Sequence, residues 1–272
     1  MKVISLFSFL GIMLGVAVLI IVMSVMNGFR NDLTDKIIGL NPHLTIHFQN
    51  KKKLENTKIE LASKYENIKF TESINGEGII MTANKAKGVI IKGINANGKF
   101  QSFLNKEITK GSLNDFSSGK VMIGGELAYN LKLNVGDKIN IISSSFIDTP
   151  LGSIPRQENF IIAGIFNSGF YEFDQNFVFL NLSDALSIFD KEEYDQNLEI
   201  YLTNPLKADS FKNEIQKLNQ NYFVYSWSDL NKSFFSALKV ERNVMFIILT
   251  LILIVAAFNI ISGLTILIKN KT

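Results

Sequence analysis

The chain has 272 residues, 47% of them hydrophobic, a formal net charge of +3 and no cysteine. The lack of cysteine excludes disulfides, thiolate metal sites and a cysteine nucleophile from this chain. All 25 acidic residues lie between Asp32 and Glu241, and only three of the 28 basic residues lie outside the slightly longer segment Arg30–Arg242, which is therefore electrically neutral. It carries no basic stripe with interleaved aromatic residues, so we expect no nucleic-acid partner.

The first apolar run extends from Val3 to Phe29 without a charged residue. A helix of about 20 apolar residues crosses the hydrocarbon core of a bilayer, so the sequence predicts a transmembrane helix over residues 1–28. A cleaved signal peptide is the rival interpretation, but the run is too long for one and lacks a small-residue cleavage motif. Gly11 and Gly15 form a G-x-x-x-G pair, which favours close packing against another helix, although glycine is common in membrane helices generally.

Residues 29–242 alternate between strand-like and helix-like segments without a strict β-α-β order, which predicts an α+β domain outside the bilayer. The first helix should continue beyond the bilayer and end at Asn41-Pro42. Strands are expected at residues 43–48, 77–84, 87–94, 121–123, 138–145, 158–166, 176–182, 197–203 and 222–227. The second and third of these strands are separated by a short polar segment and should form a hairpin.

Short helices are expected between these strands. One covers residues 54–67, another follows Gly124-Gly125, a third covers 183–189 with Ser183 as its N-cap, and a fourth covers 207–220. The first of them should bury four side chains, which are Leu54, Ile59, Leu61 and Tyr65. A last helix over residues 228–242 should run directly into the second apolar run.

The second apolar run extends from Asn243 to Ile268 without a charged residue and predicts a transmembrane helix over residues 243–268. Asn259 lies in its second half, where a buried amide usually contacts a partner helix or a cavity; a single tolerated polar residue is the alternative. Residues 269–272 form a short basic tail. Basic tails at both ends favour a cytoplasmic location for the tails and an outer location for the domain.

No catalytic or cofactor chemistry stands out. The only histidines, His43 and His47, have an even spacing that would place both on one face of a strand, but no cysteine or clear carboxylate set accompanies them. Gly93 to Lys99 matches G-x-x-x-x-G-K, but Phe100 follows where a phosphate-binding loop has serine or threonine. We therefore expect no enzyme active site, no metal and no cofactor in this chain.

Three passages together resemble a known family. They are SLFSFLGIMLGVAVLIIVMSVMNGFRNDLTDKIIGLNPHL, VMIGGELAYNLKLNVGDKI and VERNVMFIILTLILIVAAFNIISGL. The chain resembles, over essentially its whole length, the transmembrane subunits of lipoprotein-releasing (Lol) ABC transporters in the MacB/FtsX-like permease superfamily. The resemblance implies a multi-pass protein of the bacterial inner membrane with a MacB-type periplasmic domain.

The resemblance also implies a function. Such transporters extract triacylated lipoproteins from the inner membrane and pass them to the periplasmic carrier LolA, while a separate ATP-binding subunit hydrolyses ATP. A second transmembrane subunit, identical or different, is the remaining expected partner.

A hairpin at residues 146–158 resembles the hook with which LolC-type subunits hold the carrier. Prolines fix φ and lower the entropic cost of ordering a loop on a partner. The carrier-binding residues implied by the resemblance are Thr149, Pro150, Leu151, Gly152, Ser153, Ile154, Pro155 and Arg156. An ordinary surface hairpin is the alternative. The T-P…P pattern favours a LolC-type or a merged LolF-type subunit.

In the same family, acyl chains lie between the first and second spans of paired subunits. By resemblance, Val22 and Met26 in the first span and Met245 and Ile248 in the second are candidate lipid contacts. Such contacts need only apolar area, which attracts an acyl chain at about 25 cal/mol per Å². Ordinary packing or lipid-facing roles are the alternative for each.

The sequence departs from the family in length, because family members have four spans and this chain ends just past the second. A truncated or split gene product is one expectation, which would place coupling to the ATPase in doubt. The other functions left open are a different FtsX- or MacB-type permease, a two-span ligand-binding receptor, and a regulator of polysaccharide chain length, whose outer domain would consist mainly of long helices.

Overall fold

The structure is a computed structural model that describes residues 2–49, 51–65, 68–82, 85–95, 104–150, 152–192, 195–218 and 222–269. The chain divides into two compact units. The helical unit comprises Met1–Gly39 with Ser228–Thr272, and the outer unit comprises Leu40–Trp227.

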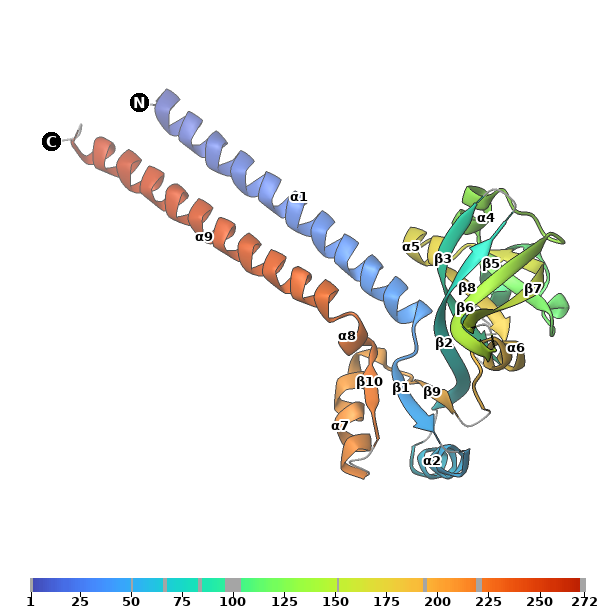
Figure 1. The fold of residues 1–272 in the computed structure, drawn as a ribbon. Helices are drawn as coiled ribbons and strands as arrows, with labels where there is room; N and C mark the ends of the chain where they lie inside the picture. Colours follow the sequence, from blue (N-terminus) through green and yellow to red (C-terminus); the bar gives the residue numbers. More distant parts are fainter. Residues whose placement is uncertain are drawn as a thin grey trace. The chain divides into compact units, whose positions relative to one another are not determined.

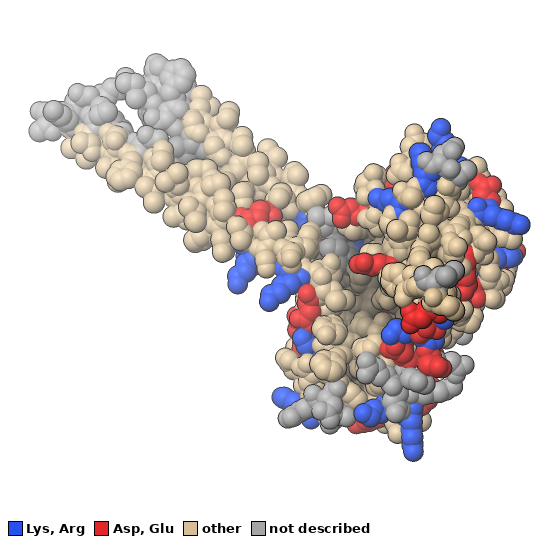
Figure 2. Space-filling model, viewed as in Figure 1, with Lys and Arg blue, Asp and Glu red and all other residues tan. Residues whose placement is uncertain are grey.

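The helical unit consists of two long helices, α1 (Lys2–Leu40) and α9 (Lys232–Lys269), which run side by side (Figure 1). Each contains a stretch long and apolar enough to cross a membrane, Phe9–Asp32 and Lys232–Phe258. The described part of this unit is uncharged over most of its length, and its charged side chains gather at one end (Figure 2). There, Arg30 Nη2 lies 3.5 Å from Glu241 Oε1 and links α1 to α9.

Both long helices continue beyond the spans expected from the sequence, at 1–28 and 243–268. α1 continues to Leu40 and stops immediately before Asn41-Pro42, and α9 already begins at Lys232 after the one-turn helix α8 (Trp227–Leu230). About 20 helical residues suffice to cross a bilayer, so each helix has several further turns outside the hydrocarbon core. Residues 270–272 of the expected tail lie outside the described part of the chain.

The first layer of the outer unit is a split β-α-β arrangement. Its strands are β1 (Leu44–Gln49), β2 (Lys69–Met81), β9 (Asp195–Tyr201) and β10 (Val224–Ser226), in the order β10-β1-β9-β2 with every neighbouring pair antiparallel. Helix α2 (Lys51–Lys64) joins the first two strands, and η2 (Pro205–Lys207) followed by α7 (Ala208–Leu218) joins the last two. This topology is that of a ferredoxin-like unit.

Helices α2 and α7 cover the same face of this sheet. Tyr65, just past α2, places its ring 4.5 Å from that of Phe211 on α7, and its hydroxyl donates to Glu214 at 3.1 Å. Beneath them, alternate strand residues such as Leu44, Ile46 and Ile200 are fully buried, as the two-residue period of a half-buried sheet requires.

Everything between β2 and β9 forms an inserted barrel. Its strands are β3 (Ala86–Ile94), β4 (Ile108–Gly111), β5 (Lys120–Gly124), β6 (Lys138–Thr149), β7 (Gly152–Phe166) and β8 (Phe177–Asn181). Its helices are η1 (Leu113–Asp115), α4 (Gly125–Leu131), α5 (Tyr171–Asn176) and α6 (Leu182–Ile188). The pairings β2–β3, β3–β8, β8–β5, β5–β7, β7–β6 and β6–β2 close a ring in which β2 serves both layers.

The barrel has two hydrophobic cores, because successive side chains of a strand point to opposite faces of the sheet. Val121 and Ile123 of β5 point into one cluster with the other inward residues of the ring, whereas Met122 between them joins a second, phenylalanine-rich cluster. That second cluster includes Phe166, Phe173 and Phe179. A helix pairs with each core: α6 contributes to the first and α5 to the second.

Two local expectations from the sequence are wrong. Ile59 is 67% exposed, and Thr57 is the residue of α2 buried between Leu54 and Leu61, where its hydroxyl lies 2.7 Å from that of Tyr222. A helical period of 3.6 accommodates position 57 on the buried face, and the hydrogen bond satisfies the threonine there. The N-cap of α6 is Asn181 rather than Ser183, because its side chain accepts from the Ser183 amide.

A buried ion pair joins the two layers of the outer unit. Lys92 Nζ of β3 lies 2.7 Å from Glu199 Oε1 of β9, and their side chains are 6% and 0% exposed. Ser73 donates to the same carboxylate oxygen at 2.7 Å, and the Tyr201 hydroxyl donates to the other at 2.9 Å. Both oxygens of Glu199 are therefore satisfied without water, as a buried charge requires.

Stability should fall at high pH through Tyr201. Burial first, and then the charge and hydrogen bond of Glu199, raise the pKa of Tyr201 well above its ordinary value near 10. Below that ordinary value the stabilisation is fully present, and it is lost as pH rises towards the folded-state pKa, because the unfolded chain releases this proton first. We expect the free energy of unfolding to drop between about pH 9 and about pH 11, and to drop less in Tyr201→Phe. Urea titrations followed by Trp227 fluorescence measure both slopes, and equal slopes would contradict the assignment.

Candidate functional site

The candidate site is the hairpin formed by β6 and β7, the latter being the longest strand of the outer unit at 15 residues (Figure 1). Pairing runs from Lys138↔Ile161 inside the barrel to Thr149↔Gly152 at the tip. The two-residue loop contains Pro150, which is exposed, and Leu151, which lies outside the described residues. Gly152 has a φ of +123°, a conformation that L side chains rarely adopt and that glycine reaches without strain.

The outer half of this hairpin presents apolar side chains to solvent. Phe146, Ile147 and Ile154 are 59%, 42% and 53% exposed. Pro155, paired with Phe146, is exposed as well and has no amide hydrogen to donate. Side chains exposed in this way on a structured hairpin are typical of protein interaction sites.

Two side-chain hydrogen bonds order the tip. Thr149 Oγ1 donates to the Gly152 carbonyl at 2.6 Å, and Ser153 Oγ donates to Asp148 Oδ1 at 2.5 Å. They bridge the two strands next to the loop, so the tip is ordered before any partner binds.

The base of the hairpin contains a bulge. The register shifts between Ile142↔Gln157 and Phe146↔Pro155, so that three serines, residues 143–145, oppose the single residue Arg156. Such a bulge bends a strand and increases its twist.

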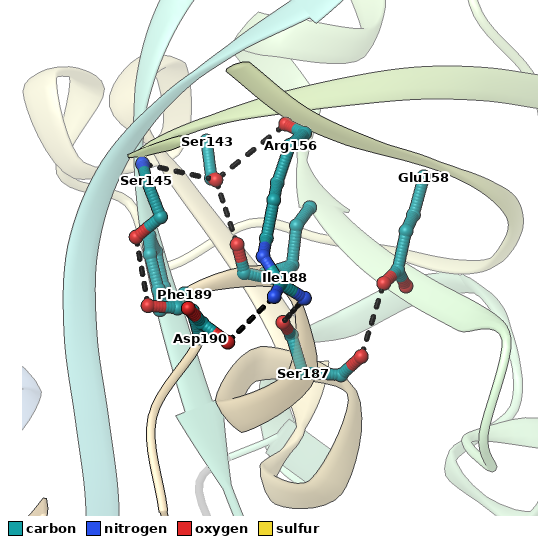
Figure 3. Close-up of polar contacts among 8 residues, drawn as sticks. All are labelled: Ser143, Ser145, Arg156, Glu158, Ser187, Ile188, Phe189 and Asp190. Carbon is teal, nitrogen blue, oxygen red and sulfur yellow. Dashed lines mark hydrogen bonds and ion pairs between the residues drawn. The ribbon is translucent and has the colours of Figure 1, made fainter. Parts of the chain in front are cut away.

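The bulge is attached to the end of α6 (Figure 3). Ser143 Oγ donates to the Ile188 carbonyl and Ser145 Oγ to the Phe189 carbonyl, both at 2.7 Å. Carbonyls at a helix C-terminus have no partner within the helix, and these two obtain one from the hairpin.

Arg156 completes the same attachment. Its Nη1 donates to the Ser187 carbonyl at 3.2 Å and its Nη2 to Asp190 Oδ1 at 2.6 Å (Figure 3). A cation at a helix C-terminus also interacts favourably with the helix dipole. Among the described hairpin residues predicted to contact a carrier, Thr149 and Ser153 bond within the hairpin, whereas the side chain of Arg156 bonds to the end of α6. Sequence reasoning missed the residues that hold it, Ser187 and Asp190, since they lie more than 30 positions away.

The predicted membrane contacts all lie in the helical unit. Val22 and Ile248 are 46% and 42% exposed, and Met26 and Met245 are partly buried. Exposed apolar residues on these helices have the chemistry that lipid contact needs.

The predicted helix-packing residues also lie in this unit. Among the residues that the structure describes, no atom comes within 4 Å of a Cβ built on Gly11 or Gly15, so their surface is open to a further helix. The side chain of Asn259 lies outside the described residues.

The histidine pair and the G-x-x-x-x-G-K match, which resemble metal-binding and phosphate-binding motifs, have structural roles where the structure describes them. His43 precedes β1 and is fully buried, its Nδ1 accepting from the Leu202 amide at 2.8 Å, whereas His47 is exposed. Gly93, at the start of the G-x-x-x-x-G-K match, faces Ala185 of α6, and a Cβ there would lie 2.2 Å from the Ala185 Cβ. The rest of that match lies largely outside the described residues. Within the described ranges, no group of three His, Asp or Glu side chains is placed to hold a metal ion.

Comparison with known proteins identifies the family. The model of the family described as MacB-like periplasmic core domain matches residues 5–218. The periplasmic region of MacB from Actinobacillus actinomycetemcomitans, a solved structure, is 15% identical, with a TM-score of 0.43 over 74% of this chain and 95% of that chain.

Curated relatives match the whole chain. The lipoprotein-releasing system transmembrane protein LolC of Neisseria meningitidis serogroup B is 29% identical over 100% of this chain and 67% of its own length. LolC of Buchnera aphidicola subsp. Schizaphis graminum is 31% identical over 99% and 68%, and LolE of Haemophilus influenzae is 28% identical over 97% and 66%. The chain thus spans about two thirds of the length of these relatives. It belongs to the family with a MacB-like periplasmic core domain, as a membrane protein similar along its whole length to the LolC and LolE transmembrane proteins of lipoprotein-releasing systems.

Proposed function

We propose that the chain acts as a transmembrane subunit of an ABC transporter that extracts lipoproteins from the bacterial inner membrane and passes them to the periplasmic carrier LolA. The observation that carries the proposal is the β6–β7 hairpin, whose ordered outer half exposes Phe146, Ile147 and Ile154. Similarity to LolC and LolE along the whole chain supports the same function.

The remaining parts of the proposal concern the membrane. The triacylated lipoprotein would contact the helical unit through Val22, Met26, Met245 and Ile248. A second transmembrane subunit would pack on the open surface at Gly11 and Gly15, where no described atom fills the groove. ATP hydrolysis would belong to a separate subunit.

One observation disfavours the polysaccharide chain-length alternative. Such outer domains are dominated by long helices, whereas the longest helix that the structure describes in the outer unit is α2, with 14 residues. The other alternative, a permease of the MacB or FtsX type with a different partner, would not bind LolA, so a binding measurement separates it from the proposed function.

Replacing Ile154 with serine should weaken carrier binding. A side chain that is 53% exposed on an ordered hairpin loses its apolar contact area with the partner and little else. We expect the dissociation constant of LolA for the full chain in detergent to rise roughly tenfold, equivalent to about 1.4 kcal/mol. Isothermal titration or surface plasmon resonance measures it.

The matched control is Ile59→Ser, which alters an isoleucine of similar exposure on α2 and should leave the affinity unchanged. Equal affinities for wild type and Ile154→Ser would refute docking through the hairpin. Undetectable binding of LolA to the wild-type chain would refute the proposed function.

A further inference from the structure

The hairpin is attached to the barrel through three successive carbonyls. Ser187 and Ile188 are the last two residues of helix α6 and Phe189 is its C-cap. Their carbonyls accept from Arg156, Ser143 and Ser145 respectively. Donors come from both strands, since the serines lie on β6 and the arginine on β7. We call the four side chains of Ser143, Ser145, Arg156 and Asp190 the carbonyl anchor.

Asp190 occupies a backbone position at which glycine is preferred. Its φ is +54°, its amide donates to the Ser187 carbonyl, and the Lys191 amide donates to that of Leu186. This hydrogen-bond pattern is a Schellman motif, whose left-handed residue is usually glycine. Aspartate tolerates this conformation but is not favoured by it. We therefore attribute the presence of aspartate here to its side chain, which binds Arg156.

The anchor lies where the direction of the hairpin is determined. It engages the bulge, the point at which the β6–β7 register shifts, and beyond it the side chains of the hairpin are mostly exposed. A bulge alone permits a range of bend and twist. Bonds from both strands to one helix end restrict that range.

We propose that the carbonyl anchor fixes the direction in which the β6–β7 hairpin projects from the barrel, and that its members are positioning residues for a partner protein that docks on the hairpin. The second half of this statement rests on the proposed function; the first half does not. The partner class is a folded protein with an apolar groove, which matches the exposed phenylalanine and isoleucines of the outer half.

The chain offers a direct test because it has no native cysteine. Ile154→Cys near the tip, where the isoleucine is 53% exposed, and Tyr129→Cys on α4, where the tyrosine is 81% exposed, accept two spin labels in the full chain in detergent. Pulsed dipolar spectroscopy then reports the distribution of tip-to-barrel distances. We expect a narrow peak for the intact anchor.

Asp190→Gly is the informative variant. Glycine suits the positive φ, so the midpoint of thermal unfolding should stay the same or rise, while the narrow distance peak is lost because Arg156 loses its carboxylate. A purely structural role for Asp190 would instead lower the midpoint. Asp190→Asn, which tolerates the same backbone and still accepts a hydrogen bond, should restore the narrow peak.

Lys191→Ala is the matched control, since it removes an ion pair with Asp195 at the same helix end without touching the hairpin. An unchanged peak in both Asp190→Gly and the Ser143→Ala/Ser145→Ala variant would overturn the anchor.

In the unlabelled chain, carrier binding by Asp190→Gly should weaken roughly threefold to tenfold, because the tip must be ordered again on docking.

A broadened peak with unchanged carrier affinity would overturn the positioning role. Absence of carrier binding to wild type would refute the proposed function and leave the distance result standing by itself, so the two failures are distinguishable.

Discussion

Lys92→Met is expected to lower the free energy of unfolding of the outer unit by about 3–5 kcal/mol. The substitution leaves the carboxylate of Glu199, which is fully buried, without the ammonium group 2.7 Å away. Ser73 and Tyr201 still donate to it, but two neutral hydrogen bonds do not replace a countercharge in a medium of low dielectric constant. Because the pair joins β3 to β9, its loss affects both layers of the unit.

Trp227, the only tryptophan and 7% exposed, reports this transition in urea titrations of the full chain in detergent. Lys58→Met is the control: it breaks a pair with Glu72 that is partly open to solvent and should cost at most about 1 kcal/mol. The double variant Lys92→Met/Glu199→Leu should recover much of the loss, because no unpaired charge remains. A loss in Lys92→Met no larger than in Lys58→Met would contradict the argument.

Gly124→Ala should destabilise the barrel by about 3 kcal/mol, at the upper end of the usual range for overpacking. A Cβ at this position would lie 1.9 Å from the carbonyl oxygen of Asp174 and 2.7 Å from its Cα. Those are backbone atoms of α5, so no side-chain rotation can relieve the contact. The φ of Gly124 is −70°, which any residue adopts, so the cost is steric rather than conformational.

The neighbouring glycine provides the control. A Cβ on Gly125 would meet only ordinary contacts, the shortest at 3.4 Å from the Phe166 carbonyl oxygen, and Gly125→Ala should be nearly neutral. Thermal unfolding of both variants, followed by circular dichroism, compares two single-methyl additions one residue apart. Similar unfolding midpoints for the two variants would contradict the expectation, because they would show that α5 can move away from the added methyl group without loss of stability.

Local patterns in the sequence predicted the elements but not their closure into a ring. The apolar residues of β5 and the apolar face of α4 are local properties, and both elements could be predicted from them. Ring closure depends on the parallel pairings β3–β8 and β5–β7, which join segments far apart in the sequence and leave no local signal. Helix α5 was missed as well, since its six residues are too few to show a helical period.

The candidate site divides in the same way. The prolines and the family resemblance pointed to the tip of the hairpin, and the register and exposure of its outer half come from the structure. The attachment to α6 could not be predicted, because it depends on which three residues form a bulge and on a positive φ at Asp190, 34 positions from Arg156. A run of three serines inside a strand was the one available signal, and serine is too common for it to be specific.

The insertion of the barrel between β2 and β9 has a consequence for synthesis. His47 of β1 pairs through its side chain with Asn197 of β9, 150 positions later, and both strands that flank β1 lie at or beyond that point. At a translation rate of 5–20 residues per second, β1 leaves the ribosome on the order of ten seconds before the strands that pair with it. The inserted barrel can close in that interval, since it needs from the first layer only β2. We therefore expect the inserted barrel to fold first and the outer layer, whose strands connect along the chain to both membrane helices, to be completed last.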